Sequence, residues 1–335
     1  MRVAQMQRRA TTARRPRCSR AVLFVTLSAL SALSAFSSVC SAAVEVQPFL
    51  GRWNVTLKAG KREYSSWLEI ATVNGAVQVR MVGRWGHARV LPEASITGDR
   101  IHFVSPKEEE GRVDTDMAFD GRLRGRSLSG TTTGPDGAPW TWHAVRAPEL
   151  RAPAVIIWGK PITLFNGRDM HGWRISDPGA HSRWLVSDGT LLSQGQGPDL
   201  RTQKTFRDFK LHIEFNCAPI SNSGVYLRGR YEVQIEVGPP PDAANQGLGS
   251  VYGFLAPQPK PHIQAGEWHA YDLTLEGRYV TVVLDGQTII DNEEIPGTTG
   301  GALDTREGSS GPILLQGSEE GRVAFRNIVI TPARD

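Results

Sequence analysis

The sequence predicts an all-β protein with two domains, and two patterns carry this prediction. After residue 44 no window shows the apolar period of a helix, whereas short runs of alternating apolar and polar residues recur. Residue pairs typical of tight hairpin turns separate these runs. The pairs are Asn74-Gly75, Asp120-Gly121, Asp136-Gly137, Asp188-Gly189 and Asp285-Gly286.

Residues 1–43 have the pattern of a secretory signal peptide. They contain seven arginines and no acidic residue, then the apolar run "AVLFVTLSALSALSAF", then "SSVCSAA" with small residues suited to cleavage after Ala43. The run is too short and too rich in serine for a comfortable membrane span, although a basic membrane anchor is the alternative. We therefore expect export to a bacterial periplasm or exterior, with no membrane span in the mature chain.

Removal of this segment changes the charge of the protein. The whole chain has 38 basic and 34 acidic residues, but without the seven arginines of 1–43 only 31 basic residues face the same 34 acidic ones. The basic character therefore belongs to the signal, and nothing indicates nucleic acid as a partner. Cys217 is the only cysteine after residue 43, so the mature chain has no pair for an internal disulfide.

A domain boundary is expected at residues 149–160. Three prolines in or beside this segment suit a stiff, extended linker: Pro148, Pro153 and Pro161. Residues 44–148 are a meander of predicted hairpins, typical of a small β-barrel or sandwich, whereas 161–335 suit a two-sheet jelly roll. Five tryptophans of the first domain either close its core, the interpretation that we favour, or line a sugar pocket: Trp53, Trp67, Trp85, Trp140 and Trp142.

The most informative stretch is "SGVYLRGRYEVQIE", residues 223–236. Read as one β-strand, it has an apolar face and a polar face, because successive side chains alternate. The polar face comprises Tyr226, Arg228, Arg230, Glu232, Gln234 and Glu236. On one strand Glu232 and Glu236 would lie about 13 Å apart, farther than the roughly 5–9.5 Å between the carboxyls of ordinary glycosidases. By itself the row is more typical of a solvated ion ladder.

Motifs of the second domain resemble the 3-keto-disaccharide hydrolase domain family. They include "LFNGRDMHGW" (164–173), "NSGVYLRGRYEVQIE" (222–236) and "IPGTTGGALDTREGSSGPILLQG" (295–317), within a resemblance that spans about residues 160–333. The resemblance implies a concanavalin A-like sandwich of two curved antiparallel sheets. It also implies activity on glycosides that carry a ketone at carbon 3, and it favours a substrate site over an ion ladder for the polar row.

The chain departs from the family pattern at two places. Relatives usually read Gln-Ile-Glu-Asp where this chain ends the motif with Val237, and Leu-Gln-Gly-Asp-His-Gly where it reads "LQGSEEG" (315–321). An Asp and an Asp-His pair are thus missing, which bears on whether this copy is active. Glu319 is a partial substitute for the missing groups.

A 3-keto sugar allows an elimination route with few catalytic groups. The ketone acidifies the hydrogen on carbon 2, so one base can form an enolate; the group on carbon 1 then leaves and water adds. We expect Glu232 to be this base, with Arg228 and Arg230 lowering its pKa and clamping the enolate oxygen. The expected substrate-binding residues are Tyr226, Gln234, Glu236, Tyr252, Gln316 and Glu319, of which Tyr226 or Tyr252 protonates the leaving oxygen.

The predicted function is therefore an exported enzyme that cleaves 3-keto-glycosides. The alternative is a non-catalytic carbohydrate-binding protein on the same fold, favoured by the missing Asp and Asp-His pair. The intact Arg-x-Arg-x-Glu-x-Gln row favours the enzyme. No cofactor is identified and no His or Cys spacing indicates zinc, while a divalent metal such as calcium, held by loop oxygens, would leave no motif in the sequence.

Overall fold

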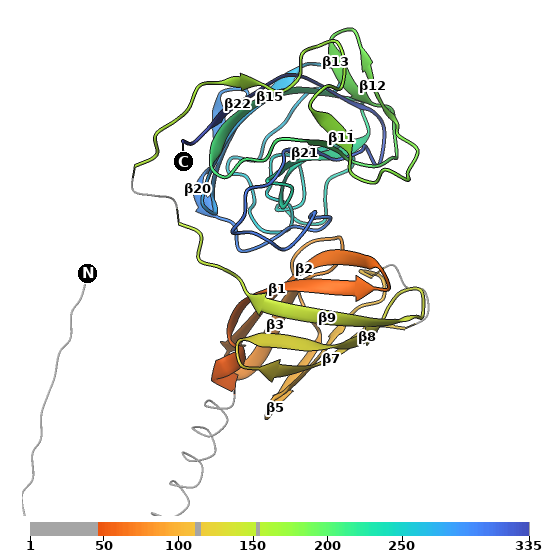
Figure 1. Cartoon of the computed structure of the whole chain (residues 1–335), viewed down its shortest axis with the longest axis vertical. Helices are drawn as coiled ribbons and strands as arrows, with labels where there is room; N and C mark the ends of the chain where they lie inside the picture. The colour runs from red at the N-terminus through yellow and green to blue at the C-terminus, as the bar shows by residue number, and fades with distance from the viewer. Residues whose placement is uncertain (1–45, 111–114, 152–154, 335) are drawn as a thin grey trace, which may run out of the picture. The chain divides into compact units, whose positions relative to one another are not determined.

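The computed structural model describes residues 46–110, 115–151 and 155–334 (Figure 1). In this part of the chain the only helix is a short 3-10 turn, η1 (Gln47–Phe49), and the other elements are 22 strands. The predicted all-β fold is thus confirmed. The predicted signal peptide lies outside the described residues, and within them no helix is long and apolar enough to cross a membrane. Residues Glu45–Asp335 form one compact unit.

The first nine strands form one antiparallel sheet in the order β4-β3-β2-β1-β9-β8-β7-β6-β5. Their bounds are β1 Gly51–Ala59, β2 Arg62–Val73, β3 Ala76–Val82, β4 Arg89–Val90, β5 Glu93–Thr97, β6 Arg100–Ser105, β7 Met117–Arg124, β8 Ser127–Thr133 and β9 Pro139–Arg146. Trp53 of β1, Met81 of β3 and Phe103 of β6 belong to one buried cluster. Because strands across the whole sheet share this core, the sheet curls around it, as in the predicted small barrel.

The later strands form a sandwich of two sheets. The larger sheet has the order β12-β13-β22-β15-β18-β19-β20, with β10 beside β22, and the smaller has the order β11-β14-β21-β16-β17. The larger contains β10 Ile162–Thr163, β12 Trp184–Ser187, β13 Thr190–Ser193, β15 Phe209–Cys217, β18 His269–Glu276, β19 Tyr279–Leu284, β20 Gln287–Glu294 and β22 Val323–Pro332. The smaller contains β11 Trp173–Ile175, β14 Leu200–Thr202, β16 Ser221–Leu227, β17 Tyr231–Val237 and β21 Leu314–Leu315.

One hydrophobic core lies between these two sheets. Phe215 of β15 and Leu273 of β18 come from the larger sheet, and Val225 of β16 and Ile235 of β17 come from the smaller one. Figure 1 shows β15 and β22 side by side, in agreement with their antiparallel pairing. The predicted jelly-roll sandwich is therefore the observed architecture of the second half of the chain.

The predicted turns are correct except for one pair. Asn74, Asp188 and Asp285 all have positive φ at the junctions β2–β3, β12–β13 and β19–β20, as hairpin turns of this kind require. Asp120-Gly121 instead lies within β7. A Cβ at Gly121 would lie 2.3 Å from the Trp142 ring, so the glycine makes room for a buried tryptophan and does not form a turn.

Three of the five tryptophans in the first domain, Trp53, Trp140 and Trp142, belong to its buried core, as favoured from the sequence. Trp67 is also fully buried but lies outside this core, so for Trp67 the favoured interpretation is wrong. Trp85 is different, because 51% of its surface is exposed.

The face of β1 and β2 that points away from the barrel core is also covered. Trp67 packs edge-to-face on Phe254 with ring centres 5.1 Å apart, and the Asn54 amide donates a hydrogen bond to the Thr305 carbonyl (2.9 Å). A Cβ at Gly297 would lie 2.2 Å from the Trp67 ring. Loops of the second half of the chain therefore bury this face. That residues 149–160 separate two independently folding domains stays a prediction.

Replacing Trp67 with Ala tests this packing. The change removes a fully buried ring between β2 and the 254 and 297 loops, so the free energy of unfolding should fall by about 3–5 kcal/mol. Val73→Ala is the control, because Val73 lies on the same strand and is 42% exposed; its effect should stay within about 0.5 kcal/mol. Chemical denaturation followed by tryptophan fluorescence measures both, and similar small effects would show that this face is not covered in solution.

Candidate functional site

The stretch 223–236 is a hairpin, and the prediction of a single strand is wrong. Strand β16 ends at Leu227, Arg228 and Gly229 turn the chain with φ of 55° and 66°, and β17 begins at Tyr231. The glycine between two arginines was the missed turn signal.

The hairpin nevertheless has the apolar face and the polar face that the sequence predicts for this stretch. The register pairs Tyr226 with Glu232 and Gly224 with Gln234, so even-numbered residues of both strands lie on the same face. Val225 and Val233 pair on the other face and join the core between the sheets.

The turn carries Arg228 and Arg230 to other partners. Arg228 Nη2 donates to the Gly277 carbonyl at 2.6 Å, and Arg230 Nε donates to Asp304 Oδ1 at 2.8 Å. Both side chains are buried, and neither lines the cavity that holds Glu232. Their predicted role as a clamp beside Glu232 is therefore wrong, because the turn ends the strand at their positions and their guanidinium groups bind other polar groups.

Glu232 lies at a cavity of about 370 Å³, within the size range of ligand pockets. Six of the predicted site residues line it: Tyr226, Glu232, Gln234, Tyr252, Gln316 and Glu319. The other lining residues are Trp85, Gly86, Gln196, Gly197, Asp199, Asn222, Gly300, Gly301 and Gly317. Glu236 is not among them and lines a separate cavity beside the proline-rich segment 238–241.

Four neighbouring strands of the smaller sheet assemble this cavity. Asp199 directly precedes β14, and Gln316 directly follows β21. Because β14, β21, β16 and β17 are adjacent in that order, their polar side chains gather on the sheet face opposite the core. The backbone N–H of Gln316 donates to the Gly224 carbonyl at 2.9 Å, which fixes the end of β21 against β16.

Burial dominates the electrostatics of Glu232. The residue is 3% exposed, and this burial raises the pKa of Glu232 well above its usual value, with the Glu319 and Asp199 charges acting in the same direction. The hydrogen bond from Tyr226 opposes this effect only in part. The expectation that arginines lower the pKa of Glu232 is thus wrong. Because its pKa is raised, the Glu232 carboxyl favours its protonated form.

The hydrogen bonds of Tyr226 fit a protonated Glu232. The Tyr226 hydroxyl lies 2.9 Å from Glu232 Oε2 and 2.8 Å from the Gly300 carbonyl. A phenol has one proton to donate, so it cannot fully satisfy both acceptors. When Glu232 is protonated, its hydroxyl donates to Tyr226 and Tyr226 donates to Gly300.

Asp199 is a second carboxyl in a different environment, and the sequence reasoning missed it. Burial raises the pKa of Asp199 to about 6, while a hydrogen bond from the Gly317 N–H at 3.0 Å favours the ionised form. Asp199 is therefore mostly ionised at neutral pH, in contrast to Glu232. It precedes a three-residue strand, too short to show an alternating pattern, so no sequence signal marked it.

Two glycines leave the room that these side chains need. A Cβ at Gly224 would lie 2.3 Å from Glu232 Oε1, and a Cβ at Gly301 would lie 2.7 Å from the Tyr226 hydroxyl. The Glu232 side chain thus lies directly over the backbone of β16. Both positions require glycine for this close approach.

The segment 315–321, which departs from the family pattern, lies beside β16 and the cavity. The Ser318 hydroxyl lies within hydrogen-bond reach of the Asn222 and Glu320 carbonyls, so it ties the loop to β16. Glu319 lines the cavity, with its Oε1 3.3 Å from Gln316 Nε2. That Glu319 partly substitutes for the missing groups stays a prediction. Among the described residues no three His, Cys, Asp or Glu side chains are grouped so as to hold a metal ion.

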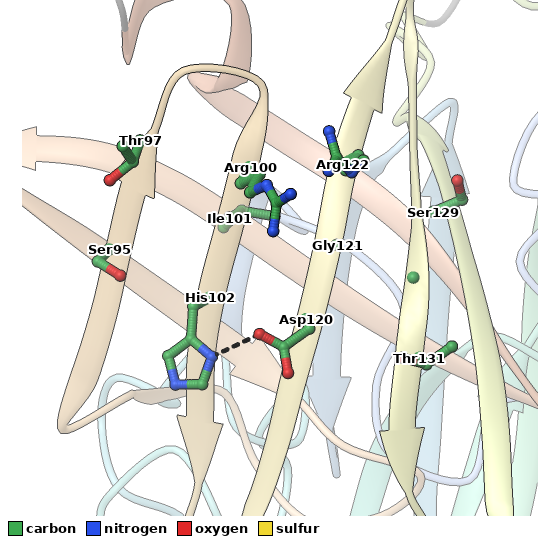
Figure 2. Close-up of a pocket in the computed structure, with 11 residues that line it drawn as sticks. Ser95, Thr97, Arg100, Ile101, His102, Asp120, Gly121, Arg122, Ser129 and Thr131 are labelled. Atoms are coloured by element: carbon green, nitrogen blue, oxygen red, sulfur yellow. Dashed lines mark hydrogen bonds and ion pairs between the residues drawn. The ribbon is translucent and has the colours of Figure 1, made fainter.

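A further cavity lies on the outer face of β5 to β8, in the first sheet (Figure 2). Its best-defined contact joins His102 Nδ1 to Asp120 Oδ1 at 2.9 Å, with Arg100 and Arg122 farther along the same face. The Asp120 side chain is 74% exposed, so these groups are solvated. This cavity contains none of the predicted site residues.

The second half of the chain is similar to known proteins. A 3-keto-disaccharide hydrolase of Bacteroides thetaiotaomicron is 29% identical over 75 residues, which cover 19% of this chain and 26% of that protein. The chain thus spans about a quarter of that relative in this match. A solved structure of a candidate glycosyl hydrolase from Parabacteroides distasonis is 29% identical, with a TM-score of 0.45, covering 53% of this chain and 91% of that one.

A second candidate glycosyl hydrolase of the same organism is 21% identical, with a TM-score of 0.43, covering 51% of this chain and 93% of that one. Residues 160–331 match the family model described as the 3-keto-alpha-glucoside-1,2-lyase-like domain. This match includes every residue of the cavity except Trp85 and Gly86. Because it also covers about half of the chain, the protein belongs to the 3-keto-alpha-glucoside-1,2-lyase-like domain family.

Proposed function

We propose that this protein cleaves glycosides that carry a ketone at carbon 3 of the sugar. Family membership supports a carbohydrate-active, glycoside-cleaving role. The observation that carries the proposal is a pair of carboxyls at one cavity whose environments differ: Glu232 is buried and favours its protonated form, and Asp199 has a pKa of about 6. Such a pair is suited to one proton donation and one proton removal at neutral pH.

The proposed reaction has two stages. In the first, a base takes the proton from carbon 2, the bond from carbon 1 to the glycosidic oxygen breaks, and a double bond forms between carbons 1 and 2. The leaving oxygen takes a proton from an acid. In the second stage water adds across the double bond, with its hydroxyl on carbon 1 and its hydrogen on carbon 2, so the sum is hydrolysis.

The environments of the two carboxyls support a division of these roles. Asp199, ionised at neutral pH, is the base for the proton on carbon 2. Glu232, with its raised pKa, is the acid that protonates the leaving oxygen. Once Glu232 has given up its proton, the Tyr226 hydroxyl turns from the Gly300 carbonyl and donates its hydrogen bond to the new carboxylate. This assignment differs from the one made from the sequence, where Glu232 was the base, because the arginines that would have kept it ionised bind elsewhere.

Binding of carbohydrate without catalysis is the second candidate function. The absence of the Asp and the Asp-His pair of the family pattern favours binding without catalysis. In the second of these segments Ser318 has a structural role, because its hydroxyl bonds to the Asn222 carbonyl. Gln234, Gln316 and Asn222 would supply hydrogen bonds to sugar hydroxyls in either case.

The two carboxyl roles can be separated by leaving-group dependence. In Glu232→Gln, turnover of methyl 3-keto-glucoside should fall about a hundred- to ten-thousandfold. Turnover of the nitrophenyl analogue should fall much less, because nitrophenolate leaves without a proton. In Asp199→Asn both substrates should slow by a similar factor, because removal of the proton on carbon 2 is needed for each.

Steady-state kinetics with both substrates, unlabelled and deuterated at carbon 2, measures these effects. Glu267→Gln is the control, since Glu267 is exposed and outside the cavity. The opposite pattern would make Glu232 the base: the nitrophenyl substrate would then restore turnover in Asp199→Asn but not in Glu232→Gln. If the wild-type protein binds the substrate and turns neither over, the binding function is the right one.

The raised pKa of Asp199 predicts a pH dependence of stability. The folded protein holds this proton with a pKa of about 6, against 3.8 for the ordinary group, so protonation stabilises the folded state at low pH. That contribution is lost as pH rises from about 3.8 to about 6 and is constant above. The unfolding free energy of Asp199→Asn minus that of wild type should therefore grow across this window and then level off. Urea unfolding at a series of pH values measures it, and parallel curves for the two proteins would contradict it.

Export is part of the same proposal. The arginine-rich start, the apolar run and the small residues before Val44 support cleavage after Ala43 and delivery to the periplasm or exterior. Mass spectrometry of the protein from its native host should find a mature N-terminus close to Val44. Recovery of chains that begin at Met1 from the cytoplasm would rule this out.

A further inference from the structure

Trp85 is the exposed tryptophan of this protein, and it lies at the candidate site. Of the chain's nine tryptophans, all within the described residues, the other eight are buried or half-buried, whereas Trp85 is 51% exposed. It lines the cavity of Glu232 and Tyr252, although it comes from the loop 83–88 that follows β3 of the first sheet. A large apolar ring left exposed beside a polar cavity is a feature of binding sites.

The backbone of this loop is held firmly against the second half of the chain. The Gly301 N–H donates to the Arg84 carbonyl at 2.9 Å. A Cβ at Gly300 would lie 2.4 Å from the Gly86 carbonyl oxygen, and a Cβ at Gly253 would lie 2.7 Å from the His87 Cα. Backbone therefore packs on backbone at two places, and the loop is a fixed part of the cavity wall.

The indole ring is also held by its own sheet. The Arg84 guanidinium lies 4.6 Å from the centre of the Trp85 ring and 5.1 Å from that of Trp140. Tyr64 packs edge-to-face on Trp85 with ring centres 6.1 Å apart. Arg84 Nη2 in turn donates to the Glu110 carbonyl at 3.0 Å, so the cation that supports the ring is anchored. The exposed half of the indole is thus presented in a fixed orientation.

We propose that Trp85 is a sugar-binding subsite that the first sheet contributes to the site of the second half of the chain. The indole would stack on the apolar C–H face of a pyranose ring, while polar residues such as Gln316 and Asn222 take its hydroxyls. The inference rests on the proposed function, and it adds that the substrate must present a sugar face to the first sheet. Trp85 is a specificity residue and takes no part in proton transfer.

The test compares wild type, Trp85→Ala, Trp85→Phe and the control Trp268→Ala. Trp268 is a matched control, because it is half-buried, has the Arg326 guanidinium 3.9 Å from its ring centre and does not line the cavity. With a 3-keto-glucoside as substrate, Trp85→Ala should raise KM about ten- to hundredfold and leave kcat within about threefold. Trp85→Phe should recover part of the loss, and Trp268→Ala should match wild type.

Two outcomes separate this inference from the proposed function. If wild type turns the substrate over and Trp85→Ala has an unchanged KM, the subsite is refuted and the function stands. If wild type does not turn it over, calorimetric titration with the same 3-keto-glucoside replaces the kinetics. Lower affinity in Trp85→Ala than in Trp268→Ala then supports the subsite, whereas equal affinities, or no binding to wild type, refute it. Should Trp85→Ala unfold, Trp85→Phe takes its place. A higher KM or a lower affinity than wild type, together with quenching of tryptophan fluorescence by the ligand in wild type, then supports the subsite, and unchanged values refute it.

Discussion

Burial of the Glu232 carboxyl against Tyr226 is the interaction on which the site depends. It exists because the turn at Arg228-Gly229 folds the chain back so that β17 pairs with β16 and sets these two residues opposite each other. The Glu232 N–H donates to Thr299 Oγ1 at 3.1 Å, and Gly224 leaves space beneath the carboxyl. A buried carboxyl without a cationic partner favours its neutral form, which is the form that the proposed acid role of Glu232 requires.

The other features of the site follow from what surrounds that carboxyl. Strand β14 begins and strand β21 ends beside the hairpin, and this brings Asp199 and Gln316 to the same face. The charge of Asp199 raises the pKa of Glu232 further. The loop 83–88 of the first sheet closes one side of the cavity through Trp85. The first domain therefore does more than precede the family domain: its residues form part of the same wall.

The sequence predicted the all-β fold and six residues that line one cavity, and the failures have physical causes. Alternation located the core and polar faces of 223–236, because the register keeps even-numbered residues together across the turn. It could not reveal the turn itself, since Arg228 adopts a positive φ that is uncommon for arginine. The two arginines were thus assigned to a site that they do not reach. Asp199 and Trp85 lie beside a very short strand and in a loop, where only the tertiary fold decides what a side chain faces.

Infrared difference spectroscopy of wild type against Glu232→Gln at pH 7 tests most directly whether the carboxyl is protonated. Wild type should show the carbonyl stretch of a protonated carboxylic acid, shifted by ¹³C labelling of glutamate and absent from the variant. If the difference spectrum instead shows the loss of an ionised carboxylate, Glu232 is charged in the folded protein and cannot be the proton donor.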